Sequence, residues 1–206
     1  NSTSLLTDEQ AKTYANDIIA FGTDVKSAVK RLKLLGIDDN EIDFETDLLS
    51  RHRTPNMAWA PNPNCSSEAC EIFSSEGGQI QPKNWERISS LAVAESTSHP
   101  KAGHPAFFRV DFQNIGTAEQ DLVMFIIGIP ESVCNHINTI VGLPDVGAMS
   151  QEAWESFGRT AINGTDGYWT FSSALTEPLG DEETSLQGEK HGCSNLNTYG
   201  NSYFTV

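Results

Sequence analysis

The sequence predicts an α+β fold in which one long N-terminal helix lies across an antiparallel β-sheet. Apolar residues recur at helical spacing near the start, and apolar stretches after residue 88 have the length and alternation of strands. No internal repeat and no linker divides the 206 residues. We therefore expect a single domain over 1–206, with a helix over 7–35, a loop region over 37–87, and a sheet with a disulfide-bounded loop over 88–206.

The predicted helix extends from Thr7 to Gly36 and is apolar along one face. Thr7 and Gln10 have the spacing of a capping box, and Gly36 suits the left-handed conformation that closes a helix. Lysine and arginine gather in the last turns, where the helix dipole favours cations. The apolar face comprises Ala11, Ala15, Ile18, Gly22, Val25, Val29 and Leu32, and is widened by Tyr14, Ile19, Phe21, Ala28 and Leu35.

The strongest strand predictions are 106–113 and 121–129, which form an antiparallel hairpin with the more apolar second strand at the centre of the sheet. A short helix over 131–141 should follow Pro130 and end at Gly142. Residues 201–206 suit a last strand. Residues 88–95 are a further strong strand candidate, whereas 70–74 and 168–171 are weaker ones. The Gly- and Ser-rich stretches 143–167 and 172–192 are predicted loops.

The net charge of −15 is unevenly distributed along the chain. Residues 1–36 hold five Lys and Arg against four Asp and Glu, whereas residues 37–206 hold eight against twenty-four. Such acidity argues against binding nucleic acid or anionic lipid through the general surface charge. Solubility of a secreted protein explains it, and calcium binding or mutual orientation of subunits are the alternatives.

Four cysteines, Cys65, Cys70, Cys134 and Cys193, fit two disulfides formed in an oxidising compartment. Three pairings exist. We favour Cys65–Cys70 with Cys134–Cys193, because the first two are close in sequence and the other two lie outside that loop. A zinc site is the competing interpretation, but the first two cysteines lack the C-x-x-C spacing and a nearby histidine.

No enzyme motif supports catalysis. G-x-S-x-G, H-E-x-x-H, the P-loop and the dinucleotide fingerprint are all missing from the sequence. His99 and His104 are interpreted as exposed loop residues, and His136 should face solvent or cap a carbonyl. We expect no cofactor and no metal ion. Calcium is the one alternative, at Asp38–Asp39 or at 181–183, and neither matches an EF-hand loop.

Together these features resemble type IV pilins and the pilin-like subunits of related secretion systems. The resemblance rests on the helix TDEQAKTYANDIIAFGTDVKSAVKRLKLLG, the looped segment and sheet that follow, and the late cysteines. The segment VCNHIN with GLP after it is similar to the cysteine-bearing helix of type IVb pilins, and GCSN before the last strand resembles the closing half of that disulfide loop. The prepilin peptidase site and the apolar helix with a glutamate at its fifth position, which are diagnostic of the family, are not in this sequence.

The resemblance implies a non-catalytic filament subunit: a major or minor pilin, or a pseudopilin. Residues 7–35 would then be the amphipathic half of a longer helix whose apolar half anchors the precursor in the inner membrane. The apolar residues of the helix face would pack between subunits, at the bacterial surface or, before assembly, on the periplasmic side of the membrane. An alternative is a secreted or periplasmic binding module or adhesin, and a secreted hydrolase is a third. For the binding module, the candidate contact residues are Trp59, Trp85, Trp154 and Trp169.

Overall fold

The computed structural model describes residues 6–44, 46, 62–89, 102–110, 121–149, 184–195 and 201–205. Its main elements are α1 (Asp8–Leu34), β1 (Pro105–Val110), β2 (Asp121–Ile127), α2 (Glu131–Val141), β3 (His191–Asn195) and β4 (Asn201–Thr205). Short 3-10 helices occupy Glu68–Cys70, Glu86–Ile88, Val146–Ala148 and Thr184–Leu186. The predicted α+β class is confirmed.

Helix α1 begins and ends as the sequence predicts. The Thr7 backbone N–H donates to Oε1 of Gln10 at 2.9 Å, and the Gln10 N–H donates to Oγ1 of Thr7 at 3.2 Å, so the capping box is complete. At the other end Gly36 has φ +87°, and the Ile37 N–H donates to the Leu32 carbonyl at 3.1 Å. This is the glycine-closed turn that satisfies the last free carbonyls of a helix.

The four strands form one antiparallel sheet in the order β1-β2-β4-β3. The predicted hairpin is present, with Phe107 of β1 opposite Met124 of β2. Strand β2 is an inner strand because it pairs with β1 and β4, and its side chains from Val123 to Ile127 are all buried, as expected for a continuous apolar run. The predicted last strand, β4, lies between β2 and β3 rather than at an edge.

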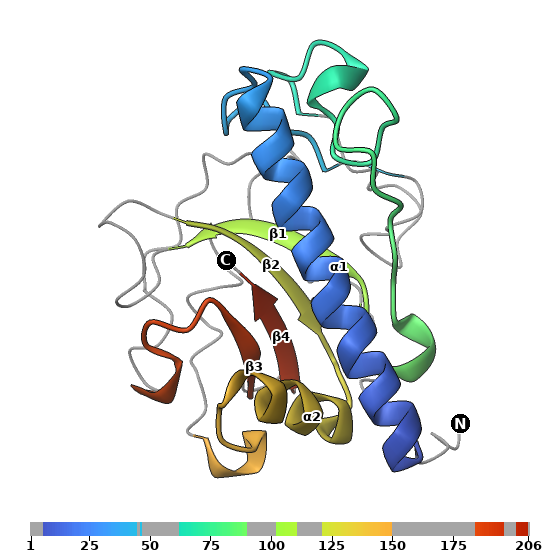
Figure 1. Cartoon of the computed structure of the whole chain (residues 1–206), viewed down its shortest axis with the longest axis vertical. Coiled ribbons are helices and arrows are strands. Elements are labelled where there is room, and N and C mark those ends of the chain that lie inside the picture. Colours follow the sequence, from blue (N-terminus) through green and yellow to red (C-terminus); the bar gives the residue numbers. More distant parts are fainter. Residues whose placement is uncertain are drawn as a thin grey trace.

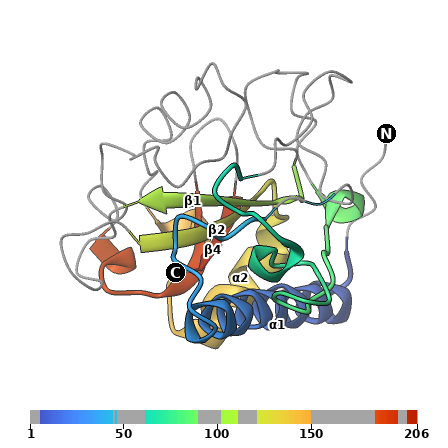
Figure 2. The same ribbon diagram turned by 90° about the horizontal axis from the view of Figure 1, so that it is seen from above.

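Both helices lie on the same face of the sheet, so the molecule has a helix layer and a sheet layer (Figures 1 and 2). Helix α1 crosses the sheet obliquely, with α2 beside its N-terminal half (Figure 1). The main core lies between these layers and includes Phe21 of α1, Met124 and Ile126 of β2, Ile137 of α2 and Tyr203 of β4.

Three local predictions differ from the structure. Cys70 ends a 3-10 helix, and Glu71 makes only a single bridge with Asp43, so 70–74 is not a strand of the sheet. Leu35 is 64% exposed at the C-cap of α1, so it does not widen the buried face of the helix. Strand β3 forms within and just beyond the predicted loop 172–192. The strand candidate 168–171 and most of 88–95 lie outside the described residues.

Candidate functional site

Both predicted disulfides are present. Cys65–Cys70 joins Cα atoms 5.6 Å apart, and Cys134–Cys193 joins Cα atoms 5.4 Å apart. All four thiols are therefore bonded to each other rather than available to zinc. The first bond closes a local turn, whereas the second connects α2 to β3 across a sequence separation of 59.

The Cys134–Cys193 bond lies in the part of the core that the N-terminal half of α1 covers. Both cysteines are fully buried and belong to the same cluster as Ala11, Ala15 and Ile137. Alanine at 11 and 15 has no bulky side chain, so α1 can approach α2 closely. We call the N-terminal half of α1 (8–21), α2 and β3 the clasp.

Asn138 fixes the edge of the sheet inside the clasp. Its Oδ1 accepts from the Cys193 N–H at 2.8 Å, and its Nδ2 donates to the Cys193 carbonyl at 3.0 Å and to the Pro144 carbonyl at 2.7 Å. The side-chain amide thus bonds β3 as a neighbouring strand would, which shields an otherwise free edge. Asn138 is fully buried. Sequence analysis missed this role, although Asn138 lies four residues after Cys134, on the same helix face.

A polar contact between α1 and α2 lies near the start of α1. His136 Nε2 is 2.9 Å from Oδ1 of Asp8. His136 is partly exposed to solvent, and its ring contacts a carboxylate at the start of α1 rather than capping a carbonyl. Asp8 itself remains largely exposed, so this bond contributes little to stability.

The seven residues predicted for packing between subunits are instead covered by the chain's own body: most by the sheet and α2, and Leu32 by Ile42 and Ile72. Six of them are buried, and Val29 is half-buried. Most of the apolar face of α1 is buried inside the molecule, because β2, β4 and α2 supply an apolar surface against it. Most of the exposed side chains of α1 are polar, with Ala20 and Leu34 as the apolar exceptions. The seven residues predicted for packing between subunits are Ala11, Ala15, Ile18, Gly22, Val25, Val29 and Leu32.

Gly22 is the closest approach between α1 and β4. A Cβ built at Gly22 would lie 2.6 Å from the Tyr203 hydroxyl and 3.1 Å from Cγ2 of Thr205. Glycine therefore makes room for a fully buried tyrosine ring under the helix. Burial raises the pKa of Tyr203 above its usual value, and the neighbouring Thr205 opposes that rise.

Two residues considered for surface roles are in the core. Trp85 is 4% exposed, packs edge-on against Phe21 and donates from Nε1 to Oδ2 of Asp17 at 3.1 Å. It is therefore a structural residue and not a contact for a ligand. His104 was interpreted as an exposed loop residue, but it is 4% exposed, with Nε2 3.3 Å from Oε2 of Glu86. Trp59, Trp154, Trp169 and His99 lie outside the described residues.

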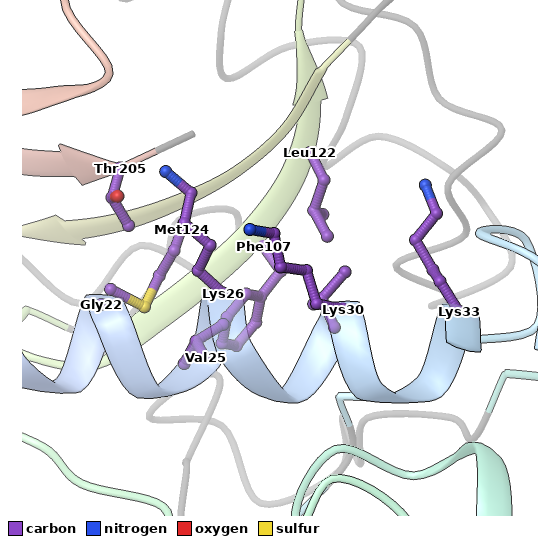
Figure 3. Close-up of a pocket in the computed structure, with 10 residues that line it drawn as sticks. Gly22, Val25, Lys26, Lys30, Lys33, Phe107, Leu122, Met124 and Thr205 are labelled. Atoms are coloured by element: carbon purple, nitrogen blue, oxygen red, sulfur yellow. The ribbon is translucent and has the colours of Figure 1, made fainter. Parts of the chain in front are cut away.

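A groove lies between the C-terminal half of α1 and strands β1 and β2, with a volume of about 240 Å³. Figure 3 shows Lys26, Lys30 and Lys33 rising from α1 on the side of the strands. We call this the lysine groove. Sequence analysis assigned these lysines to the helix dipole, and the apolar floor became apparent only in the folded chain. The floor and ends are formed by Gly22, Val25, Val29, Phe107, Leu122, Met124 and Thr205.

Within the described ranges, no group of three His, Cys, Asp or Glu residues is arranged to hold a metal ion. Asp39, one of the residues considered for calcium, pairs with Lys33 at 3.0 Å, and residues 181–183 lie outside the described part. Among the helices of the described segments, none has the length and apolar character needed to cross a membrane. The chain matches no protein-family model, no curated protein and no solved structure.

Proposed function

We propose that this chain is a non-catalytic structural subunit of a type IV pilus or of a related secretion or adhesion filament. The observation that carries the proposal is the arrangement of α1, the antiparallel sheet and the late disulfide. A 27-residue N-terminal helix lies along the sheet, and the α2 cysteine is bonded to β3, next to the C-terminal strand. These are the parts on which the resemblance to type IVb pilins rests.

Different segments of the chain would have different roles in the proposed subunit. Within the clasp, buried apolar contacts hold α1 against α2, and a disulfide bonds α2 to β3, so that force applied along α1 would be transmitted to the sheet. The acidic remainder of the chain would face outward in the filament. Partners would be other subunits and, before assembly, the inner membrane, which would be reached through an apolar segment upstream of α1.

The capped start of α1 determines how such an apolar segment would be joined. Thr7 has ψ 159°, and its side chain bonds the helix N-terminus, so the helix does not continue through Thr7. An upstream helix would therefore meet α1 at a break in the backbone, in place of the single longer helix that the resemblance to pilins implies. That break would let the body tilt relative to the anchor.

Immunoelectron microscopy of the encoding organism tests the proposal. Antibodies raised against the purified chain should label surface filaments, along their length for a major subunit or at one end for a minor one. Deletion of the gene should remove or shorten the filaments. Label confined to a soluble secreted or periplasmic fraction, with filaments unchanged by the deletion, would contradict the proposal and support the binding-module alternative.

A further inference from the structure

The lysine groove combines an apolar floor with a row of cations. Phe107 of β1 and Met124 of β2 extend toward α1, and Val25 of α1 extends the apolar lining (Figure 3). Val29 of α1 also lines the groove. Phe107 is held in place by stacking against Phe44, with ring centroids 4.0 Å apart. The floor is therefore a fixed surface that is already in place before any ligand binds.

The cations along the rim are concentrated in an otherwise acidic protein. Lys26, Lys30 and Lys33 are spaced by four and three residues, which places them on one side of α1. Lys33 is paired with Asp39. Among the described residues, no carboxylate lies within ion-pair distance of Lys26 or Lys30. Two cations at the groove thus lack an anionic partner within this part of the chain.

The surroundings of Lys26 disfavour its charged form. Burial lowers the pKa of Lys26, and repulsion from Lys190 and Lys30 lowers it further. A bound anion would offset both the like-charge repulsion and the lost hydration. The groove therefore favours a ligand with a negative head group next to an apolar body.

We propose that the lysine groove binds a small anionic amphiphile, with its apolar chain on the Phe107–Met124 floor and its carboxylate between Lys26 and Lys30. The groove volume of about 240 Å³ equals that of roughly eight water molecules, which suits a single short chain. A protein partner would need a far larger contact, at least about 1,000 Å² in total. The net charge of −15 also repels an acidic polypeptide or a second copy much more than a molecule with one negative charge.

Titration calorimetry with dodecanoate, kept below its micelle-forming concentration, tests the proposal on the whole chain. Dodecanoate should bind, whereas acetate, which lacks the chain, and dodecyltrimethylammonium, which reverses the charge, should bind at least tenfold more weakly. Lys26→Gln and Lys30→Gln should each weaken dodecanoate binding about fivefold to tenfold. Lys12→Gln, on the same helix but outside the groove, should change it less than twofold, and thermal melts should show that all variants fold.

A second variant tests the floor independently of charge. Leu122→Trp places a large side chain in the groove and should reduce dodecanoate binding more than tenfold while the lysines remain. The proposal is overturned if dodecanoate does not bind, if the cationic amphiphile binds equally well, or if the lysine variants bind like Lys12→Gln. It is also overturned if sedimentation shows self-association that Lys26→Gln abolishes, or if a Glu-rich peptide binds more tightly than dodecanoate. Those results would assign the groove to a second copy or to a protein partner.

Discussion

The N-terminal half of α1 packs through Ala11, Ala15 and Ile18, all fully buried, whereas its C-terminal half carries lysines along an open groove. In the clasp, Ala11, Ala15 and Ile18 share one buried cluster with Ile137 of α2, and a disulfide and Asn138 connect α2 to β3. In the groove, Val29 is only half-buried and the rim is cationic. One helix therefore anchors the fold at one end and offers a binding surface at the other.

The largest expected effect comes from opening the clasp at its disulfide. Replacing Cys134 and Cys193 together by alanine should lower the free energy of unfolding by about 4 kcal/mol, because the bond closes a long loop in the unfolded chain. The matched replacement of Cys65 and Cys70, which are separated by 5, should cost only about 2 kcal/mol. Urea denaturation measures both. Equal losses would show that loop closure is not what distinguishes the two bonds.

Asn138→Ala should be the next most damaging change. It leaves the buried N–H and carbonyl of Cys193 without a partner, along with the part-buried Pro144 carbonyl, which should cost about 3 kcal/mol in urea denaturation. The control is Asn16→Ala, whose side chain bonds the Lys12 carbonyl on an exposed face, with an expected change of at most about 0.5 kcal/mol. Similar losses for the two variants would mean that Asn138 does not hold the sheet edge.

Gly22 marks the boundary between the two halves, and filling it should have an intermediate effect. Gly22→Ala forces a Cβ toward the Tyr203 hydroxyl, and the cost of overpacking, less the gain in helix propensity, should be about 1–2 kcal/mol. Tyr203→Phe removes the clashing oxygen. The double variant should therefore recover most of the loss, and a double-mutant cycle with no coupling between the two sites would contradict this geometry.

The smallest expected effect is the pH dependence contributed by His191. Burial and Lys26 lower its pKa, with Glu189 opposing them, so the unfolded chain binds this proton more readily than the folded one. Stability from this residue should be complete above the unfolded value of about 6.5 and fall as the pH drops below it. Melting temperatures between pH 7.5 and 5 should fall less steeply for His191→Gln. Identical slopes for the two proteins would contradict the shift.

Much of the clasp could be predicted from sequence because its signals are local. The apolar periodicity of α1, the Thr7 capping box and the Gly142 end of α2 all appear within short stretches. The Cys134–Cys193 pairing follows once Cys65 is assigned to its near neighbour Cys70. Strand β3 could not be predicted, since His-Gly-Cys-Ser-Asn has little strand preference of its own. It is a strand because β4 pairs with it on one side and Asn138 on the other.

The lysine groove could not be predicted from the sequence, because the features that define it are not local. The spacing of Lys26, Lys30 and Lys33 is visible in the sequence, but it is equally typical of the end of any helix. Only the approach of Phe107 and Met124, which are far away in the chain, turns that row of cations into the rim of an apolar surface. The floor thus depends on tertiary packing that no local pattern encodes.

The proposed function depends most directly on what precedes α1 in the mature protein. Protein extracted from membranes of the encoding organism can be sequenced from its N-terminus by mass spectrometry and compared with the encoded precursor. We expect an apolar segment of about 20 residues before Asn1, with a glutamate at its fifth position and a peptidase cleavage site just upstream of it. A mature N-terminus within a few residues of Asn1, or a polar segment there, would contradict the assignment as a filament subunit.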